Sequence, residues 1–279
     1  MLNNNQMSNI NYKKLTSSSV SKLSNFMSKS KFKYLVIDNF LKKEVAKKIE
    51  SSFKLNSNWT NYSLINNYKK YGLNDKSVMS KDVLKTIDAL GEKKFLKILT
   101  KITNIKNLFL DHSLDGAGLH QVYNKGYLNI HTDFASHHKN LKWKRVINLL
   151  IYFNRDWQDS YGGSLELYDK HGKKILKSIS PKFNRAVIFI TNDTSYHGHT
   201  KKLKLPKNVS RKSLALYYYV NTRKIINSKS TKYISKKNDS ILFKALINFE
   251  NYLLRSFDFL KKMNIMDDKS ASKILNIFK

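Results

Sequence analysis

The sequence predicts a mainly β fold of the α+β class, with a jelly-roll core buttressed by N-terminal helices and followed by a C-terminal helix. Apolar residues recur at helical spacing in the N-terminal third and again near the C-terminus. After Leu114 the pattern changes to short β-rich runs, with turn signals such as Gly126 and Gly162-Gly163 between them. About eight short strands spaced in this way are typical of a β-sandwich or jelly roll.

The N-terminal region is expected to contain a disordered segment, a strand and a helix. Residues 1–31 are polar and lack apolar periodicity, so we expect them to be disordered. An apolar strand is expected at residues 32–38. Its last residue, Asp38, is expected to cap a helix that reaches about residue 49.

A loop and a second helix are expected before the strands. Residues 51–79 are rich in Asn and Tyr and should be mostly loop. A helix is then expected over residues 80–102, continuing past Gly91. The expected strands are 118–124, 127–131, 145–153, 164–168, 174–179, 186–191, 195–200 and 212–220.

The C-terminal region is expected to be helical. A linker rich in Lys and Ser leads to a helix near residues 239–262. We expect its apolar stripe, which includes Leu246 and Phe249, to pack on the core, with a dimer contact as the alternative. The chain is therefore divided into a disordered N-terminus (1–31), a core domain (32–225) and a linker with a helical extension (226–279).

Composition limits the chemistry and the partners. The chain of 279 residues has no cysteine, so any metal must bind His, Asp or Glu. The net charge of +32 comes mostly from lysines spread along the whole chain, which favours a solvated surface; nucleic acid is nevertheless a candidate partner. No run has the length of a membrane span and no signal peptide precedes the first strand, so we expect a soluble cytoplasmic protein.

A candidate metal site begins with His131 and Asp133. At strand spacing the two side chains leave the same face, because only Thr132 separates them. A third ligand must come from a distant strand, and His197 and His199 both qualify. We favour His197, which follows an apolar strand after a short polar turn. Two imidazoles and one carboxylate are the set that holds ferrous iron and leaves positions open for chemistry.

The other histidines are expected to have ordinary hydrogen-bonding or surface roles. They are His112, His120, His137, His138 and His171.

A candidate anion site lies downstream of the metal ligands. Arg211 opens a strand, and Ser213 is expected on the same face. A guanidinium that points into a barrel is costly unless it meets an anion, and its fork matches a carboxylate. Tyr152 ends another apolar strand, from which its phenol could reach the same carboxylate.

Five segments, taken in their order and spacing, carry a family resemblance. They are Val36–Leu41, Tyr123-Asn-Lys-Gly126 followed by His131-Thr-Asp133, Asn148–Trp157, Gly162–Leu167 and Ser180–Phe189. The stretch from Tyr123 to about Tyr219 resembles the 2-oxoglutarate- and Fe(II)-dependent dioxygenases, particularly the prolyl-4-hydroxylase-like branch. The resemblance implies a double-stranded β-helix with Fe(II) held by His131, Asp133 and His197.

The resemblance also implies a co-substrate and a reaction. The distal carboxylate of 2-oxoglutarate would meet Arg211, assisted by Tyr152 and Ser213, and Tyr123 would be a further co-substrate contact. Oxygen would be consumed and 2-oxoglutarate decarboxylated to succinate while a peptidyl residue, such as proline, or a small molecule is hydroxylated. Ascorbate is a further compound that the resemblance suggests. The oligomeric state cannot be read from the sequence.

Two alternative functions are kept. The positive charge favours an oxygenase that modifies nucleic acid. A metal-binding jelly roll without catalytic activity is the other alternative, but such a module would not need the anion clamp expected at Arg211 and Tyr152.

Overall fold

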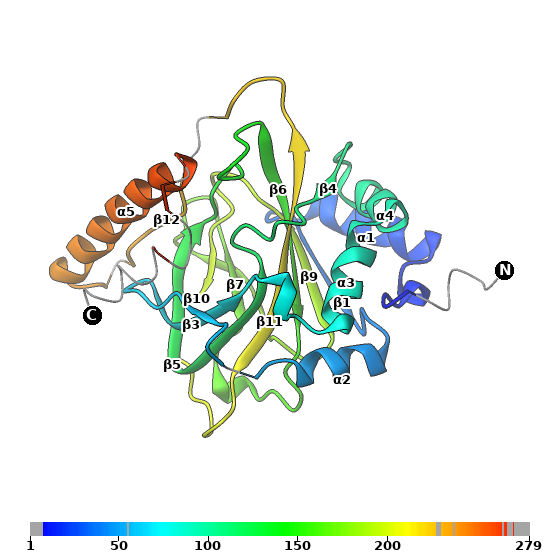
Figure 1. Cartoon of the computed structure of the whole chain (residues 1–279), viewed down its shortest axis with the longest axis horizontal. Coiled ribbons are helices and arrows are strands. Elements are labelled where there is room, and N and C mark those ends of the chain that lie inside the picture. Colours follow the sequence, from blue (N-terminus) through cyan, green and yellow to red (C-terminus); the bar gives the residue numbers. More distant parts are fainter. Residues whose placement is uncertain are drawn as a thin grey trace.

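The computed structural model describes residues 8–54, 56–226, 230–236, 238–263, 265, 266 and 270. Its centre is a curled antiparallel sheet with the strand order β1-β9-β6-β11-β5-β10-β7-β8 (Figure 1). The strands on this path are β1 (Tyr34–Asp38), β5 (Gly118–Thr132), β6 (Trp143–Tyr152), β7 (Leu165–Tyr168), β8 (Ile175–Ile179), β9 (Arg185–Ile190), β10 (His197–His199) and β11 (Arg211–Asn221). The jelly-roll core that the sequence predicts is confirmed.

Strand β5 joins the two halves of the barrel. The two strands expected at 118–124 and 127–131 are one strand of 15 residues. Its first half pairs with β11, and its second half pairs with β10. One strand therefore links the candidate anion site on β11 to the candidate metal site on β10.

The region 51–79 is more ordered than expected. It contains β2 (Thr60–Asn61) and β3 (Asn67–Leu73), together with the short 3₁₀ helix η2 (Lys76–Val78). Strand β3 pairs with β5 over most of its length. Most of the region is irregular, as expected, but the expectation missed β3 because hydrogen bonds to β5, which sequence periodicity does not report, stabilise this strand. Two further short strands are β4 (Phe109–Leu110) and β12 (Lys232–Tyr233).

Four helices cover one side of the barrel (Figure 1): α1 (Ser17–Lys29), α2 (Lys43–Ser51), α3 (Lys81–Gly91) and α4 (Lys93–Thr103). The single helix expected over 80–102 is two helices, because Glu92 has extended backbone angles. A Cβ at Gly91 would lie 2.7 Å from His112 Nε2, so a larger residue there would require the His112 side chain to move. Asp38 does not cap α2, which begins after Lys42; instead it forms an ion pair with Arg185.

The described part of the N-terminus is ordered, contrary to the expectation of disorder for 1–31. Ile10 bridges to Leu41, the 3₁₀ helix η1 (Tyr12–Lys14) follows, and α1 then packs against α4. The Thr16 side chain caps α1 by accepting a hydrogen bond from the backbone N–H of Ser19. Few apolar residues lie between the serines and lysines, but Met27 is only 2% exposed. Burial by α4 therefore stabilises a helix whose composition resembles that of a disordered segment.

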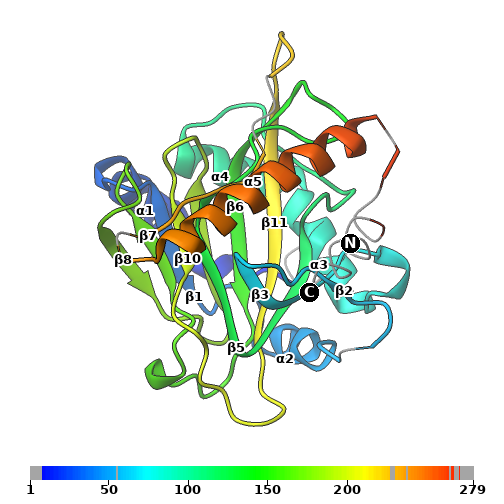
Figure 2. The ribbon, with the colours of Figure 1, turned by 90° about the vertical axis from the view of Figure 1, so that its left-hand side faces the viewer.

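The C-terminal helix α5 (Ile241–Lys262) lies on the opposite side of the barrel and crosses its strands (Figure 2). The expectation that its apolar stripe packs on the core was wrong in part. Leu246 and Phe249 are 38% and 58% exposed, whereas the buried residues include Ile247 and Phe257. Polar contacts add to this packing, because Glu250 accepts a hydrogen bond from the backbone of Asn66. None of the helices described has the length and apolar character needed to cross a membrane.

The burial of Met27 provides a test of the order of α1. Met27→Ala should lower the free energy of unfolding by about 2–4 kcal/mol, because it opens a cavity in the core beneath α1. Lys22→Ala, on the exposed face of the same helix, should change it by less than about 0.5 kcal/mol. Urea unfolding of both variants measures the difference, and equal stabilities would show that α1 does not contribute to the fold.

Candidate active site

Three side chains converge inside the barrel. His131 lies at the end of β5 and pairs directly with His197 at the start of β10, and Asp133 follows β5. The Nε2 atom of His131 lies 3.7 Å from Asp133 Oδ1, and that of His197 lies 3.5 Å from Asp133 Oδ2. Among the described residues, only these three place metal-ligating atoms within 4.8 Å of one another. The cluster contains His197 and not His199.

Both imidazoles present Nε2 to the cluster. The Nδ1 atom of His131 lies 2.9 Å from the carbonyl oxygen of Asn129, and the Nδ1 atom of His197 lies 2.9 Å from that of Ser195. A carbonyl oxygen only accepts, so Nδ1–H donates, and in the neutral form of each ring Nε2 keeps its lone pair. Burial, together with the neighbouring His197, lowers the pKa of His131 to about 3, which keeps this imidazole neutral at pH 7.

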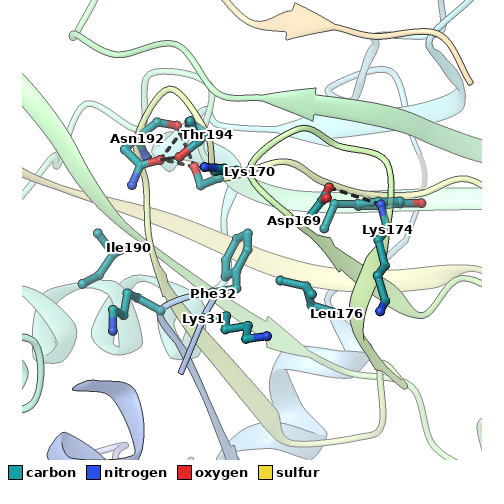
Figure 3. Close-up of a pocket in the computed structure, with 12 residues that line it drawn as sticks. Lys31, Phe32, Asp169, Lys170, Lys174, Leu176, Ile190, Asn192 and Thr194 are labelled. Carbon is teal, nitrogen blue, oxygen red and sulfur yellow. Dashed lines mark hydrogen bonds between the residues drawn. The ribbon is translucent and has the colours of Figure 1, made fainter. Parts of the chain in front are cut away.

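The turn before β10 positions His197. The Asn192 side chain accepts hydrogen bonds from the backbone and hydroxyl of Thr194, and the Ser195 hydroxyl bonds the backbone of Asn192 (Figure 3). This turn presents the Ser195 carbonyl to His197. A hollow of about 390 Å³ lies beside the turn, lined also by Phe32 and lysines. None of the metal-ligand candidates lines this hollow.

Arg145 fixes the charge of Asp133. One of its terminal nitrogens lies 3.1 Å from Asp133 Oδ2, and its Nε donates to Asn148, whose amide donates to the same carboxylate oxygen at 2.7 Å. The guanidinium also lies 3.3 Å from the centre of the Tyr217 ring. Burial alone would raise the pKa of Asp133, but the Arg145 guanidinium and the hydrogen bond from Asn148 hold it well below its usual range.

Sequence reasoning did not assign Arg145 to the site. A signal was present, because it is one of only six arginines in the chain and lies in an otherwise apolar strand. An ion within such a strand is costly to bury and therefore indicates a nearby anion.

A cavity of about 500 Å³ opens beside Asp133 and Arg145, lined also by Lys144, Asp193 and Ile226. Of the three residues of the cluster, only Asp133 lines this cavity.

The candidate anion site is also assembled. Arg211 is buried at the start of β11, its Nε donates to the carbonyl oxygen of Gly163 at 2.7 Å, and a terminal nitrogen donates to the Tyr152 hydroxyl at 3.3 Å. Gly163 has φ +69°, and a Cβ there would lie 2.5 Å from Leu203, so this close approach requires glycine. Ser213 pairs with Tyr152 across β11 and β6, and it lies on the same face as Arg211.

The structure does not bring Tyr123 to these residues. Val122 is the residue of β5 that pairs with Arg211, so Tyr123 lies on the opposite face. Its hydroxyl lies 3.2 Å from Gln121 Oε1, and its ring contacts Tyr71 on the same outer face. The expected co-substrate contact of Tyr123 is therefore corrected, because the tyrosine motif does not reveal which face of β5 it occupies.

Two histidines that were expected to have ordinary roles have specific positions in the barrel. His120 faces its interior, and His138 ties α5 to it. His120 pairs with Ser213 and so shares the inner face. His138 is buried between two carboxylates, with Nδ1 at 2.6 Å from Asp115 and Nε2 at 3.1 Å from Asp258 of α5. Burial opposes the charge of this imidazole, but the two hydrogen-bonded carboxylates raise the pKa of His138 to about 9.

The raised pKa of His138 predicts a pH dependence of stability. Its stabilising contribution should be complete below the unfolded pKa of about 6.5 and should be lost as the pH rises toward 9. Asp258→Asn removes one carboxylate, so the variant should lose about 1–2 kcal/mol less than the wild type between pH 6 and pH 9.5. Urea unfolding at both pH values measures this difference; identical pH profiles would contradict the charged pairing.

Comparisons with known proteins agree with the resemblance found in the sequence. Residues 118–219 match the family model described as the 2OG-Fe(II) oxygenase superfamily. Over 79 residues the chain is 32% identical to the prolyl 3-hydroxylase OGFOD1 of Mus musculus. The aligned stretch covers 27% of this chain and only 14% of that relative.

Solved structures share the fold at low sequence identity. A prolyl hydroxylase of Trichoplax adhaerens, in complex with a hypoxia inducible factor peptide fragment, has a TM-score of 0.50 and 15% identity, covering 73% of this chain and 93% of that one. A prolyl-4-hydroxylase of Pseudomonas putida has a TM-score of 0.51 and 10% identity, covering 72% and 99%. HygX of Streptomyces hygroscopicus, with nickel and 2-oxoglutarate bound, has a TM-score of 0.50 and 12% identity, covering 71% and 86%.

Proposed function

We propose that this protein is an Fe(II)- and 2-oxoglutarate-dependent dioxygenase that hydroxylates a peptidyl residue, because residues 118–219 match the family model of the 2OG-Fe(II) oxygenase superfamily. Proline is the leading candidate, since similar proteins include prolyl hydroxylases. One observation supports this function above the others: two imidazoles, a carboxylate and a buried arginine–tyrosine pair share one barrel interior.

The donor set fits ferrous iron. His131 and His197 each offer an Nε2 atom, and Asp133 offers an ionised carboxylate, which together form the facial set used by non-haem iron oxygenases. Their spacing leaves room for one ion among the three atoms. When bound, iron and 2-oxoglutarate would supply the oxygen-activating chemistry of hydroxylation.

The other residues of the site orient the Asp133 carboxylate and the co-substrate and shield the site from water. Arg145 and Asn148 hold the Asp133 carboxylate in place, so that it keeps its charge and its direction. Arg211 and Tyr152 would orient the distal carboxylate of the co-substrate, and Ser213 is a further candidate contact. Phe189 packs against the ring of His197, with centroids 4.8 Å apart, and excludes water from that side of the site.

An unpaired buried atom supports the co-substrate fit. His199 is 4% exposed, and its Nδ1 has no hydrogen-bond partner among the described residues. A buried polar atom without a partner is costly, and an acidic ligand in the barrel would remove that cost.

The dioxygenase domain, expected at 32–225, would also include α1, which packs on α4. Ascorbate binding and the target molecule stay predictions.

Removal of the carboxylate ligand tests the metal site. Asp133→Ala should weaken Fe(II) binding by at least about 100-fold, because one of three protein ligands is lost. Anaerobic titration with Fe(II), followed by calorimetry, measures the affinity. Asp159→Ala, at an exposed position, is the control and should bind as the wild type does; an unchanged affinity in Asp133→Ala would reject the site.

Removal of the guanidinium tests the co-substrate site separately. Arg211→Met should weaken 2-oxoglutarate binding by about 10- to 100-fold and leave Fe(II) affinity unchanged, because the charged hydrogen bonds are lost. The visible charge-transfer band of the anaerobic Fe(II)–2-oxoglutarate complex reports this binding. Arg223→Met, on the surface, serves as the matched control. If the wild type shows no such band at millimolar 2-oxoglutarate, the proposed function is wrong.

A further inference from the structure

Lys70 lies opposite Arg211 on the inner face of the barrel. Lys70 on β3 pairs with Val122 on β5, and Val122 pairs on its other side with Arg211 on β11. Residues paired across neighbouring strands share a face, so the three side chains form one row. Two strand spacings place the Cα atoms of the two cations about 10 Å apart. The Lys70 side chain is long enough to reach the space over Val122, and the Arg211 guanidinium is held at Gly163 and Tyr152.

The two cations differ from Arg145 in their partners. Arg145 forms an ion pair with Asp133, whereas Arg211 donates to the carbonyl of Gly163 and to the Tyr152 hydroxyl, which are both neutral. Lys70 forms no ion pair with an acid among the residues that the structure describes. Burial lowers the pKa of Lys70 to about 8, and although Asp133 opposes this shift, Arg145 and Arg211 add to it. Lys70 is still charged at pH 7.

Two neutral histidines lie beside the same space. The side chain of His120 is on the inner face, between the strands of Lys70 and Arg211, and burial with the charges of these two residues lowers the pKa of His120 well below its usual range. His199 experiences the same two charges and has the unpartnered Nδ1 described above. The interior therefore presents two cations and an unpartnered polar atom, and the one acid of the described residues close to them, Asp133, is ion-paired with Arg145.

We propose that Lys70 is a second cation for the distal carboxylate of 2-oxoglutarate, which would be held between Arg211 on β11 and Lys70 on β3. This inference rests on the proposed function. We assign Lys70 to the distal carboxylate and not to the metal-chelating end of 2-oxoglutarate. The reason is that its row contains Arg211 and lies on the first half of β5, whereas the metal ligands lie at the other end of this strand. A carboxylate has two oxygens and can accept from both cations at once.

A pair of ligands that differ by this carboxylate provides the test. 2-Oxoglutarate and 2-oxopentanoate have the same chain length and the same chelating end, but the second lacks the distal carboxylate. Each is titrated anaerobically into Fe(II)-loaded wild type and Lys70→Met, with the charge-transfer band as the readout. We expect the Kd of 2-oxoglutarate to rise about 10-fold or more in the variant, and that of 2-oxopentanoate to change less than about twofold. Lys70→Arg keeps the charge and should retain most of the affinity.

The controls separate charge from folding. Lys212→Met removes a lysine next to Arg211 whose side chain lies on the other face of β11, and it should bind both ligands as the wild type does. If Lys70→Met loses Fe(II) affinity or secondary structure, Lys70→Gln replaces it in the same titration.

Three outcomes would overturn the inference. Unchanged 2-oxoglutarate affinity in Lys70→Met would exclude Lys70 as a contact. An equal loss for both ligands would place its effect at the chelating end or on the barrel itself. A loss of affinity for an added target alone, with both oxoacids unaffected, would assign Lys70 to target binding. Absence of the band in the wild type would instead reject the proposed function.

Discussion

The arrangement of the barrel interior depends on one buried carboxylate. Asp133 can remain ionised away from solvent because Arg145, Asn148 and two imidazoles surround it. Arg145 in turn is held by the Tyr217 ring and by Asn148, so strands β6 and β11 set the position of a group that follows β5. A carboxylate without these partners would be protonated or would leave the interior. The metal site is therefore built by the sheet as a whole.

Strand β5 couples the two parts of the site. It contributes His131 to the metal cluster at one end, and Val122 to the row between Lys70 and Arg211 at the other. The register of β5 shifts between Val122 and Tyr127, but both ends of the strand are hydrogen-bonded within the sheet, so the sheet and not a flexible loop holds the metal site and the anion site relative to each other. A co-substrate of defined length can then bridge the two sites.

The charge of the interior is a separate property from the charge of the surface. Most of the net charge of +32 comes from lysines spread along the chain. Lys70, Arg145 and Arg211 are different, because they are directed into the barrel, where low polarity strengthens each interaction. The His138 pair with Asp115 and Asp258 shows a similar use of buried charge, here to attach α5.

The sequence alone determined the jelly-roll class and the likeness to the oxygenase family. Strand spacing, the His131-x-Asp133 pair and the distal His197 are patterns that can be recognised in the chain without knowing which segments pack together. It also indicated Arg211 and Tyr152, which the structure brings together. Only the tertiary structure decided the order of α1, the exposed stripe of α5, the outward face of Tyr123 and the inward face of Lys70. These features depend on which distant segment packs or pairs with each residue, and such partners leave no periodic trace in the chain.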